Sequence, residues 1–165
     1  GSHLLWVYTM AQAVLKPFGL DGKNSYMAPD DATVERIRRD NPQLKDAEFL
    51  VPAPGRPKTF VMSGTILAPT GYRADKANVV SFQVSPDYTG SPFSPNNGTV
   101  DYPSQRGRKN GRLARRAIGG GFVETFAFGG EAPASIEVAA EAARAGRTLA
   151  MRAPREPLSL AKTVG

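Results

Sequence analysis

Hydrophobic residues near the start of the chain recur at helical spacing. Leu4, Tyr8, Ala11 and Leu15 are three or four positions apart, and Pro17 ends the run. This spacing predicts a first helix before residue 17. Its apolar stretch contains polar residues and is shorter than the roughly 20 residues that a membrane-spanning helix needs. We therefore expect no membrane partner.

A second helix is predicted over residues 32–39. Asp30 and Asp31 precede it, and Arg38 and Arg39 close it. This order places negative charge at the beginning and positive charge at the end, which the helix dipole favours. Residues 52–57 then contain three prolines and a glycine, the composition of a stiff linker.

After this linker the hydrophobic period changes to two, which is typical of strands. Strands are predicted over residues 59–67, 78–85, 122–128 and 148–152, with a weak fifth over 158–164. An alanine-rich helix is predicted over residues 135–145 and ends at Gly146. Between the second and third strands lies a long loop, residues 86–121, and loops of this length inside a domain are usually functional.

The 165 residues are enough for one domain. Residues 1–3 have the sequence of a remnant left by a cleaved affinity tag and are set aside. Residues 4–57 are interpreted as an N-terminal extension with a proline-rich linker. Residues 58–165 are interpreted as the main domain, which includes the 86–121 loop.

Composition excludes several kinds of catalytic site. The chain has no cysteine, and its one histidine, His3, lies in the tag-like segment. Thiolate zinc sites, cysteine nucleophiles and Ser-His-Asp triads are therefore excluded for the remaining chain. The carboxylates of the main domain are scattered without metal-ligand spacing. We expect no enzymatic activity, no metal and no cofactor.

The net charge of +6 is concentrated in one segment. Residues 106–116 contain six cations and no acid: Arg106, Arg108, Lys109, Arg112, Arg115 and Arg116. Their number equals the whole excess of positive charge, so the rest of the chain is neutral overall. A localised basic run of this kind predicts contact with the phosphates of a nucleic acid. Arg73 and Lys76, in the loop after the first predicted strand, are further candidates.

Aromatic residues accompany these cations. Bases of a single strand stack on flat side chains, and the candidates in or beside loops are Tyr72, Tyr88, Phe93 and Tyr102. Phe126 and Phe128, on the third predicted strand, are further candidates because that strand can contribute to a binding face.

The element order predicts a mainly β fold, a five-stranded OB-fold barrel with a helix between its third and fourth strands. Residues 59–152 also resemble the core of the bacterial-type single-stranded-DNA-binding proteins. The similar features are Gly64, Pro69, Arg73, the strand NVVSFQVS, the segment ETFAFGG and Arg144-Ala145-Gly146.

This resemblance implies a homo-oligomer that binds single-stranded DNA, or RNA, without strong sequence specificity. It also implies a place in DNA replication and repair, in the cytoplasm and nucleoid or in an organelle matrix. Two other functions fit the same residues. One is a structural protein of a virus-like assembly with a basic arm facing nucleic acid, and the other is an OB-fold adaptor that binds a protein.

Overall fold

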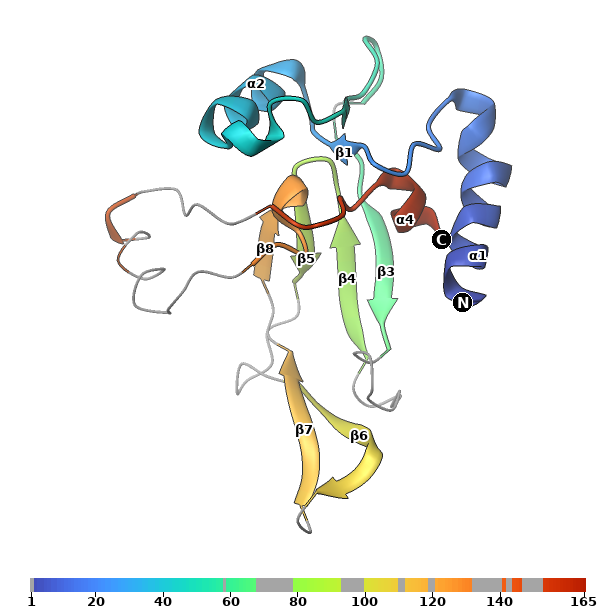
Figure 1. Ribbon diagram of the computed structural model, residues 1–165, viewed down its shortest axis with the longest axis vertical. Helices are drawn as coiled ribbons and strands as arrows, with labels where there is room; N and C mark the ends of the chain where they lie inside the picture. The colour runs from blue at the N-terminus through green and yellow to red at the C-terminus, as the bar shows by residue number, and fades with distance from the viewer. Residues whose placement is uncertain are drawn as a thin grey trace. The chain divides into compact units, whose positions relative to one another are not determined.

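The chain divides into two units, and one of them is assembled from two separate stretches. Unit 1 comprises residues 1–59 and 124–165, and unit 2 comprises residues 60–123. The computed structural model (Figure 1) describes residues 2–57, 59–67, 79–92, 100–109, 112–118, 121–131, 141, 144–146 and 153–165. Of residues 2, 3, 100–109 and 112–118 only the backbone is described.

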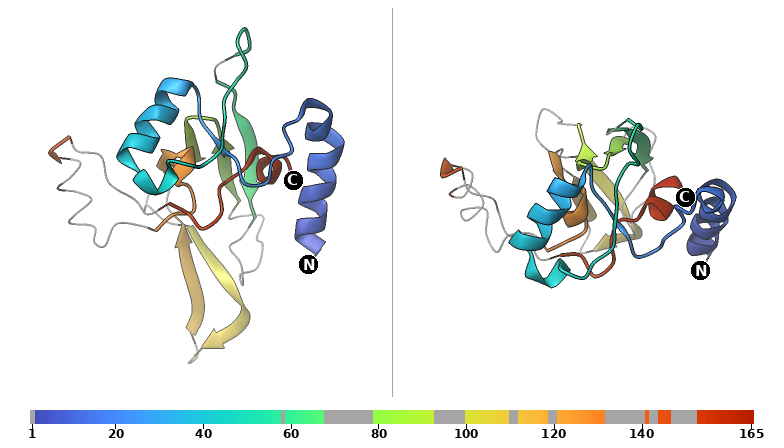
Figure 2. Two further views of the ribbon diagram at one scale, coloured as in Figure 1. Left: turned by 45° about the horizontal axis from the view of Figure 1, so that its top comes forward. Right: turned by 90° about the horizontal axis from the view of Figure 1, so that it is seen from above.

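Unit 1 begins with the predicted N-terminal helix, which is confirmed. α1 (Ser2–Met10) continues as a π-helix (Ala11–Leu15) and a 3₁₀ turn (Lys16–Phe18), and it ends at Gly19, whose φ of 70° few other residues adopt. Val7, Ala11 and Leu15 are buried. The short helix α4 (Leu160–Val164) lies beside this helical segment (Figure 2), so the two ends of the described chain pack together.

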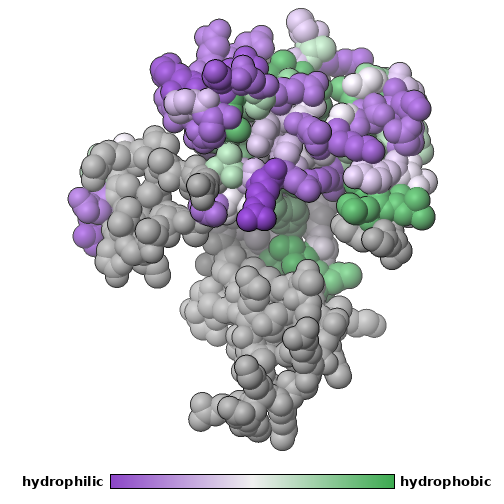
Figure 3. Space-filling model, viewed as in Figure 1, coloured by the Kyte–Doolittle hydropathy of each residue, from purple (hydrophilic) through white to green (hydrophobic). Residues whose placement is uncertain are grey.

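The other side of α1 is also apolar. Two large apolar side chains near its beginning are exposed to solvent: Leu5 is 69% exposed and Trp6 is 58% exposed. Hydrophobic residues gather over the beginning of α1 on the face drawn in Figure 3. The helix is therefore hydrophobic on both its buried and its exposed side, unlike a standard surface helix.

The predicted second helix is also confirmed, as α2 (Asp31–Asp40). The carboxylate of Asp30 accepts a hydrogen bond of 2.8 Å from the backbone N–H of Thr33, which is the contact of an N-cap. Val34 and Ile37 are buried one turn apart. A 3₁₀ turn (Pro42–Leu44) follows directly.

The core of unit 1 forms around a short parallel pair of strands, β1 (Tyr26–Met27) and β2 (Phe49–Leu50). The rings of Tyr26 and Phe49 stack with their centroids 5.4 Å apart. Tyr26 forms a buried cluster with Ile37 and Leu44, and Phe126 packs against it. Residues far apart in the sequence therefore share one apolar core.

Unit 2 contains a four-stranded sheet with the order β3-β4-β5-β8. Its strands are β3 (Met62–Ile66), β4 (Val80–Val84), β5 (Tyr88–Ser91) and β8 (Gly121–Glu124), whose last residue belongs to unit 1. β3 and β4 confirm the first two predicted strands, although both are shorter than predicted. They pair antiparallel, with Gly64 opposite Phe82.

Glycine is required where β5 meets β8. A Cβ atom at Gly90 would overlap the backbone of Gly121 and Phe122. Gly90 itself lies opposite Gln83 of β4, so it is held between two strands. A larger residue here would push β8 away from the sheet.

Three predictions about secondary structure are wrong. The segment 86–121, predicted to be a loop, contains β5 and two long strands, β6 (Val100–Lys109) and β7 (Arg112–Ile118). The strand predicted over 122–128 ends at Glu124, because Thr125–Ala127 form a buried 3₁₀ turn. Residues 158–164, predicted as a weak strand, contain α4, because Ser159 caps a helix instead.

The barrel prediction is correct only at a coarser level. The part of the chain that the structure describes contains helices, the four-stranded sheet, the parallel pair and a two-stranded β6–β7 sheet, and no closed barrel is formed by it. Of the helix predicted over 135–145, Glu141 and Arg144 are described and are helical. Gly146 follows with a φ of 63°, as expected of a residue that ends a helix. The strand predicted over 148–152 lies outside the described residues.

Candidate nucleic-acid interface

The basic run folds into the two long strands of unit 2. β6 and β7 pair antiparallel, from Val100 opposite Ile118 to Lys109 opposite Arg112. Two residues, Asn110-Gly111 in the sequence, join the last pair, and this dipeptide is the strongest sequence signal for a two-residue hairpin. The basic residues therefore belong to two paired strands and not to an extended loop.

The pairing is irregular in the middle of the hairpin. Pro103 lies opposite Arg115 and Arg108 lies opposite Leu113, so the four residues between Pro103 and Arg108 face a single residue of β7. Proline has no N–H to donate to the ladder, which fits a break at this point. Arg106 falls inside the irregular segment and has no register partner.

The register divides the hairpin residues between two faces. Residues directly opposite each other in an antiparallel pair share a face, and neighbours along a strand alternate. One face, here named the tyrosine face, holds Val100, Tyr102, Lys109, Arg112, Arg116 and Ile118. The other, named the aspartate face, holds Asp101, Pro103, Arg108, Leu113, Arg115 and Ala117.

The two faces differ in chemistry. The tyrosine face combines three cations with an aromatic residue and has no acid. The aspartate face has two cations, and Asp101 offsets one of them. The tyrosine face is therefore the more strongly basic side of the hairpin.

The remaining candidate residues are only partly placed. Tyr72, Arg73, Lys76 and Phe93 lie outside the described residues. Tyr88 begins β5 and is 54% exposed, so its ring is accessible to a ligand. Its backbone N–H donates to the Ser85 hydroxyl at 3.0 Å, which closes the turn between β4 and β5.

Phe126 and Phe128 do not lie on a strand. Phe126 is in the 3₁₀ turn and packs against the Tyr26 cluster of unit 1. Phe128 follows the turn and donates its backbone N–H to the Thr125 carbonyl at 3.2 Å. The assignment of these two residues to a sheet face that binds nucleic acid therefore loses its structural basis.

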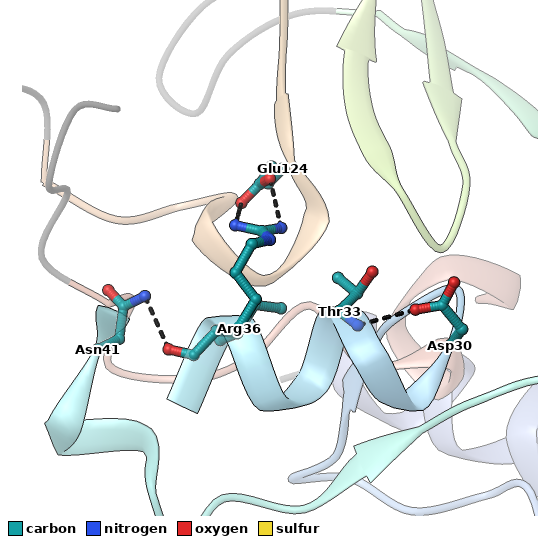
Figure 4. A network of polar contacts seen from close by, with 6 residues as sticks. Asp30, Thr33, Arg36, Asn41 and Glu124 are labelled. Atoms are coloured by element: carbon teal, nitrogen blue, oxygen red, sulfur yellow. Dashed lines mark hydrogen bonds and ion pairs between the residues drawn. The ribbon is translucent and has the colours of Figure 1, made fainter. Parts of the chain in front are cut away.

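Sequence reasoning missed an ion pair that anchors the end of β8. The guanidinium of Arg36 on α2 donates to both carboxylate oxygens of Glu124, at 2.7 and 3.5 Å (Figure 4). The two residues are 88 positions apart, and no local pattern connects them. The carboxylate of Glu124 is therefore engaged in an ion pair within the fold.

Two features were sought in the part of the chain that the structure describes. It holds no group of three or more acidic, histidine or cysteine residues arranged to bind a metal ion. None of its helices is both long and apolar enough to cross a membrane.

Comparison with known proteins gives no relative from which a function can be transferred. No family model matches the chain, and no curated protein and no solved structure matches it.

Proposed function

We propose that this protein binds single-stranded nucleic acid, with a preference for DNA over RNA, and that it does not catalyse a reaction. The observation that carries the proposal is the placement of the basic run on the paired strands β6 and β7. A hairpin fixes the spacing of its cations, so several phosphates of one strand can be neutralised together. Because phosphate contacts read no base edges, sequence specificity is expected to be weak.

The charge distribution supports the proposal. Unit 2 carries eight basic and three acidic residues, a net charge of +5, whereas unit 1 carries 13 and 12, a net charge of +1. A polyanion would thus be attracted mainly to unit 2. If all six cations of the run contacted phosphates of a single strand, the log–log salt slope of binding would be about −4, at about 0.7 per contact.

We also propose that unit 2 and the segment that follows it form an OB-fold. Consecutive strands β3, β4 and β5 form an antiparallel meander, which is consistent with the first part of such a barrel. Oligonucleotides bind to the face and loops of that fold, so the proposed fold and the proposed function agree.

Binding is tested by fluorescence anisotropy with labelled oligo-dT, oligo-rU and duplex DNA of equal length, over a series of salt concentrations. We expect tightest binding to oligo-dT, weaker binding to the duplex, and a steep salt dependence. The variant Arg112→Glu with Arg115→Glu should weaken binding by about tenfold or more and flatten the salt slope.

Unit 1 offers a matched control with the same change in charge. Arg39→Glu with Lys45→Glu reverses two cations whose side chains are 72% and 74% exposed. This variant should retain nearly full affinity. Equal affinity for all three nucleic acids would show that the basic segment binds polyanions without selecting single strands. Absence of binding at low salt would overturn the proposal.

A further inference from the structure

We infer that the two faces of the β6–β7 hairpin are not equivalent and that the strand of nucleic acid runs along the tyrosine face. This inference rests on the proposed function and adds to it which residues make the contact and why the ligand is unpaired. It depends on the backbone register of the hairpin, in which Tyr102 lies opposite Arg116 and Lys109 lies opposite Arg112.

The cations of the tyrosine face are spread along the hairpin. Arg112 and Arg116 are four residues apart on β7, so their backbone positions are separated by roughly 14 Å. Lys109 shares the register position of Arg112 near one end, and Tyr102 shares that of Arg116 further along. Positive charge therefore occurs at two points on the same face, with an aromatic residue at the second.

The aspartate face is less suited to a polyanion. Asp101 is a formal negative charge on that face, and a phosphate brought close to it would be repelled. Its other positions include Pro103, Leu113 and Ala117, which offer no charged or hydrogen-bonding side chain. The two arginines of this face, Arg108 and Arg115, are therefore expected to contribute mainly to the long-range field.

The aromatic residue selects the class of ligand. A tyrosine stacks on the flat surface of a base, and that surface is accessible only when the base is not stacked within a duplex. Phosphates, in contrast, are accessible in both forms. The register partners Tyr102 and Arg116 thus favour an unpaired strand, which offers both an accessible base and a phosphate.

The chain provides a comparison in which the change in charge is held constant. Arg112→Glu with Arg116→Glu alters the tyrosine face, and Arg108→Glu with Arg115→Glu alters the aspartate face of the same hairpin. Affinity of the full chain for labelled oligo-dT should fall by about tenfold or more in the first variant and by less than about threefold in the second. Because both variants lose the same charge, a purely long-range effect would weaken binding equally.

Tyr102 is tested separately with two substitutions. Tyr102→Ala should weaken binding of oligo-dT by about fivefold or more, leave the salt slope unchanged and leave duplex binding unchanged. Tyr102→Phe keeps the ring and should restore the affinity for oligo-dT. If the role of Tyr102 is merely structural, Tyr102→Ala would instead lower the affinity for oligo-dT and for the duplex together. Circular dichroism of each variant verifies that the fold is retained.

The outcomes separate this inference from the function on which it rests. If the unaltered protein binds oligo-dT and both arginine pairs weaken it equally, the face assignment is wrong while the proposed function stands. A larger loss from the aspartate-face variant would reverse the assignment. If the unaltered protein binds neither oligo-dT nor duplex at low salt, the function itself is wrong.

Discussion

The two units of this protein differ in where they carry apolar residues and where they carry charge. Unit 1 contains most of the buried hydrophobic residues that the structure describes, among them Tyr26, Ile37 and Leu160, and its net charge is only +1. Among the residues of unit 2 whose side chains the structure describes, Val80 and Val84 are the buried hydrophobic ones, and this unit has a net charge of +5. Burial and charge are thus divided between separate parts of the chain.

This difference indicates a division of roles. Burial of apolar surface is the main favourable term in folding, so unit 1 is built to stabilise itself. Concentrated like charge opposes compaction but attracts a polyanion, which is consistent with the ligand binding proposed for unit 2. Substitutions in unit 1 should therefore act on stability, and substitutions of the unit 2 cations should act on binding.

The largest effect is expected in the core of unit 1. Ile37 is 2% exposed, and Ile37→Ala should lower the free energy of unfolding by about 2–5 kcal/mol through lost burial and a cavity. Urea unfolding followed by circular dichroism, which reports on both units, measures the change. Val61→Ala, at a residue 57% exposed in unit 2, is the control with little expected effect. If both substitutions lower the free energy of unfolding equally, the contrast in burial between the two units is contradicted.

The next largest effect should come from the sheet of unit 2. Gly90→Ala introduces a methyl group that overlaps the backbone of Gly121, and overpacking of this kind costs about 1–3 kcal/mol. Hydrogen exchange should show faster exchange in β5 and β8 with little change in α2. Gly55→Ala tests a glycine whose Cβ meets no atom but whose φ of 80° still disfavours alanine. If Gly55→Ala proves equally harmful to the sheet, the overlap at Gly90 is not the cause.

A smaller effect is expected from the ion pair of Arg36 and Glu124. Both side chains are about one third exposed, at 36% and 31%, so water screens the pair and its contribution should be about 0.5–1 kcal/mol. A double-mutant cycle with Arg36→Ala and Glu124→Gln isolates this term. A coupling energy near zero would show that the geometry in Figure 4 does not stabilise the protein.

The smallest effect concerns alkaline pH. Burial raises the pKa of the Tyr26 phenol above its usual value of 10.0, because desolvation disfavours the phenolate. The folded state therefore holds this proton more tightly than the unfolded state, and stability falls as pH rises above 10. Tyr26→Phe removes this group, so its loss of stability with rising pH should be slightly shallower. Parallel curves for the two proteins between pH 9 and 11 would contradict the assignment.

Local patterns predicted those elements whose physical cause is local. α2 followed from an acidic cap and terminal arginines, and β3 and β4 followed from alternating hydrophobic residues. The basic hairpin was missed because β7, with the sequence RLARRAI, has no clean alternation of apolar and polar residues. The dipeptide Asn110-Gly111 was the signal that would have revealed it.

Contacts between distant segments were not predictable in the same way. Nothing in the spacing of Arg36 and Glu124 indicates that they meet, and nothing near Leu160 shows that this helix lies beside α1. The strand predicted through Phe126 failed for the same reason, since the Tyr26 cluster, which lies 100 residues earlier, provides its packing partner. The candidate cations were identified from the sequence, whereas their division between two faces required the register.

Because unit 1 is formed by residues 1–59 and 124–165, the 64 residues of unit 2 are an insertion within its chain. Folding of unit 1 must close that intervening segment, but the entropy of closing a loop grows only with the logarithm of its length. Doubling a flexible insertion costs about 0.6 kcal/mol. A change in the length of a flexible part of this intervening segment should therefore lower the stability of unit 1 only slightly.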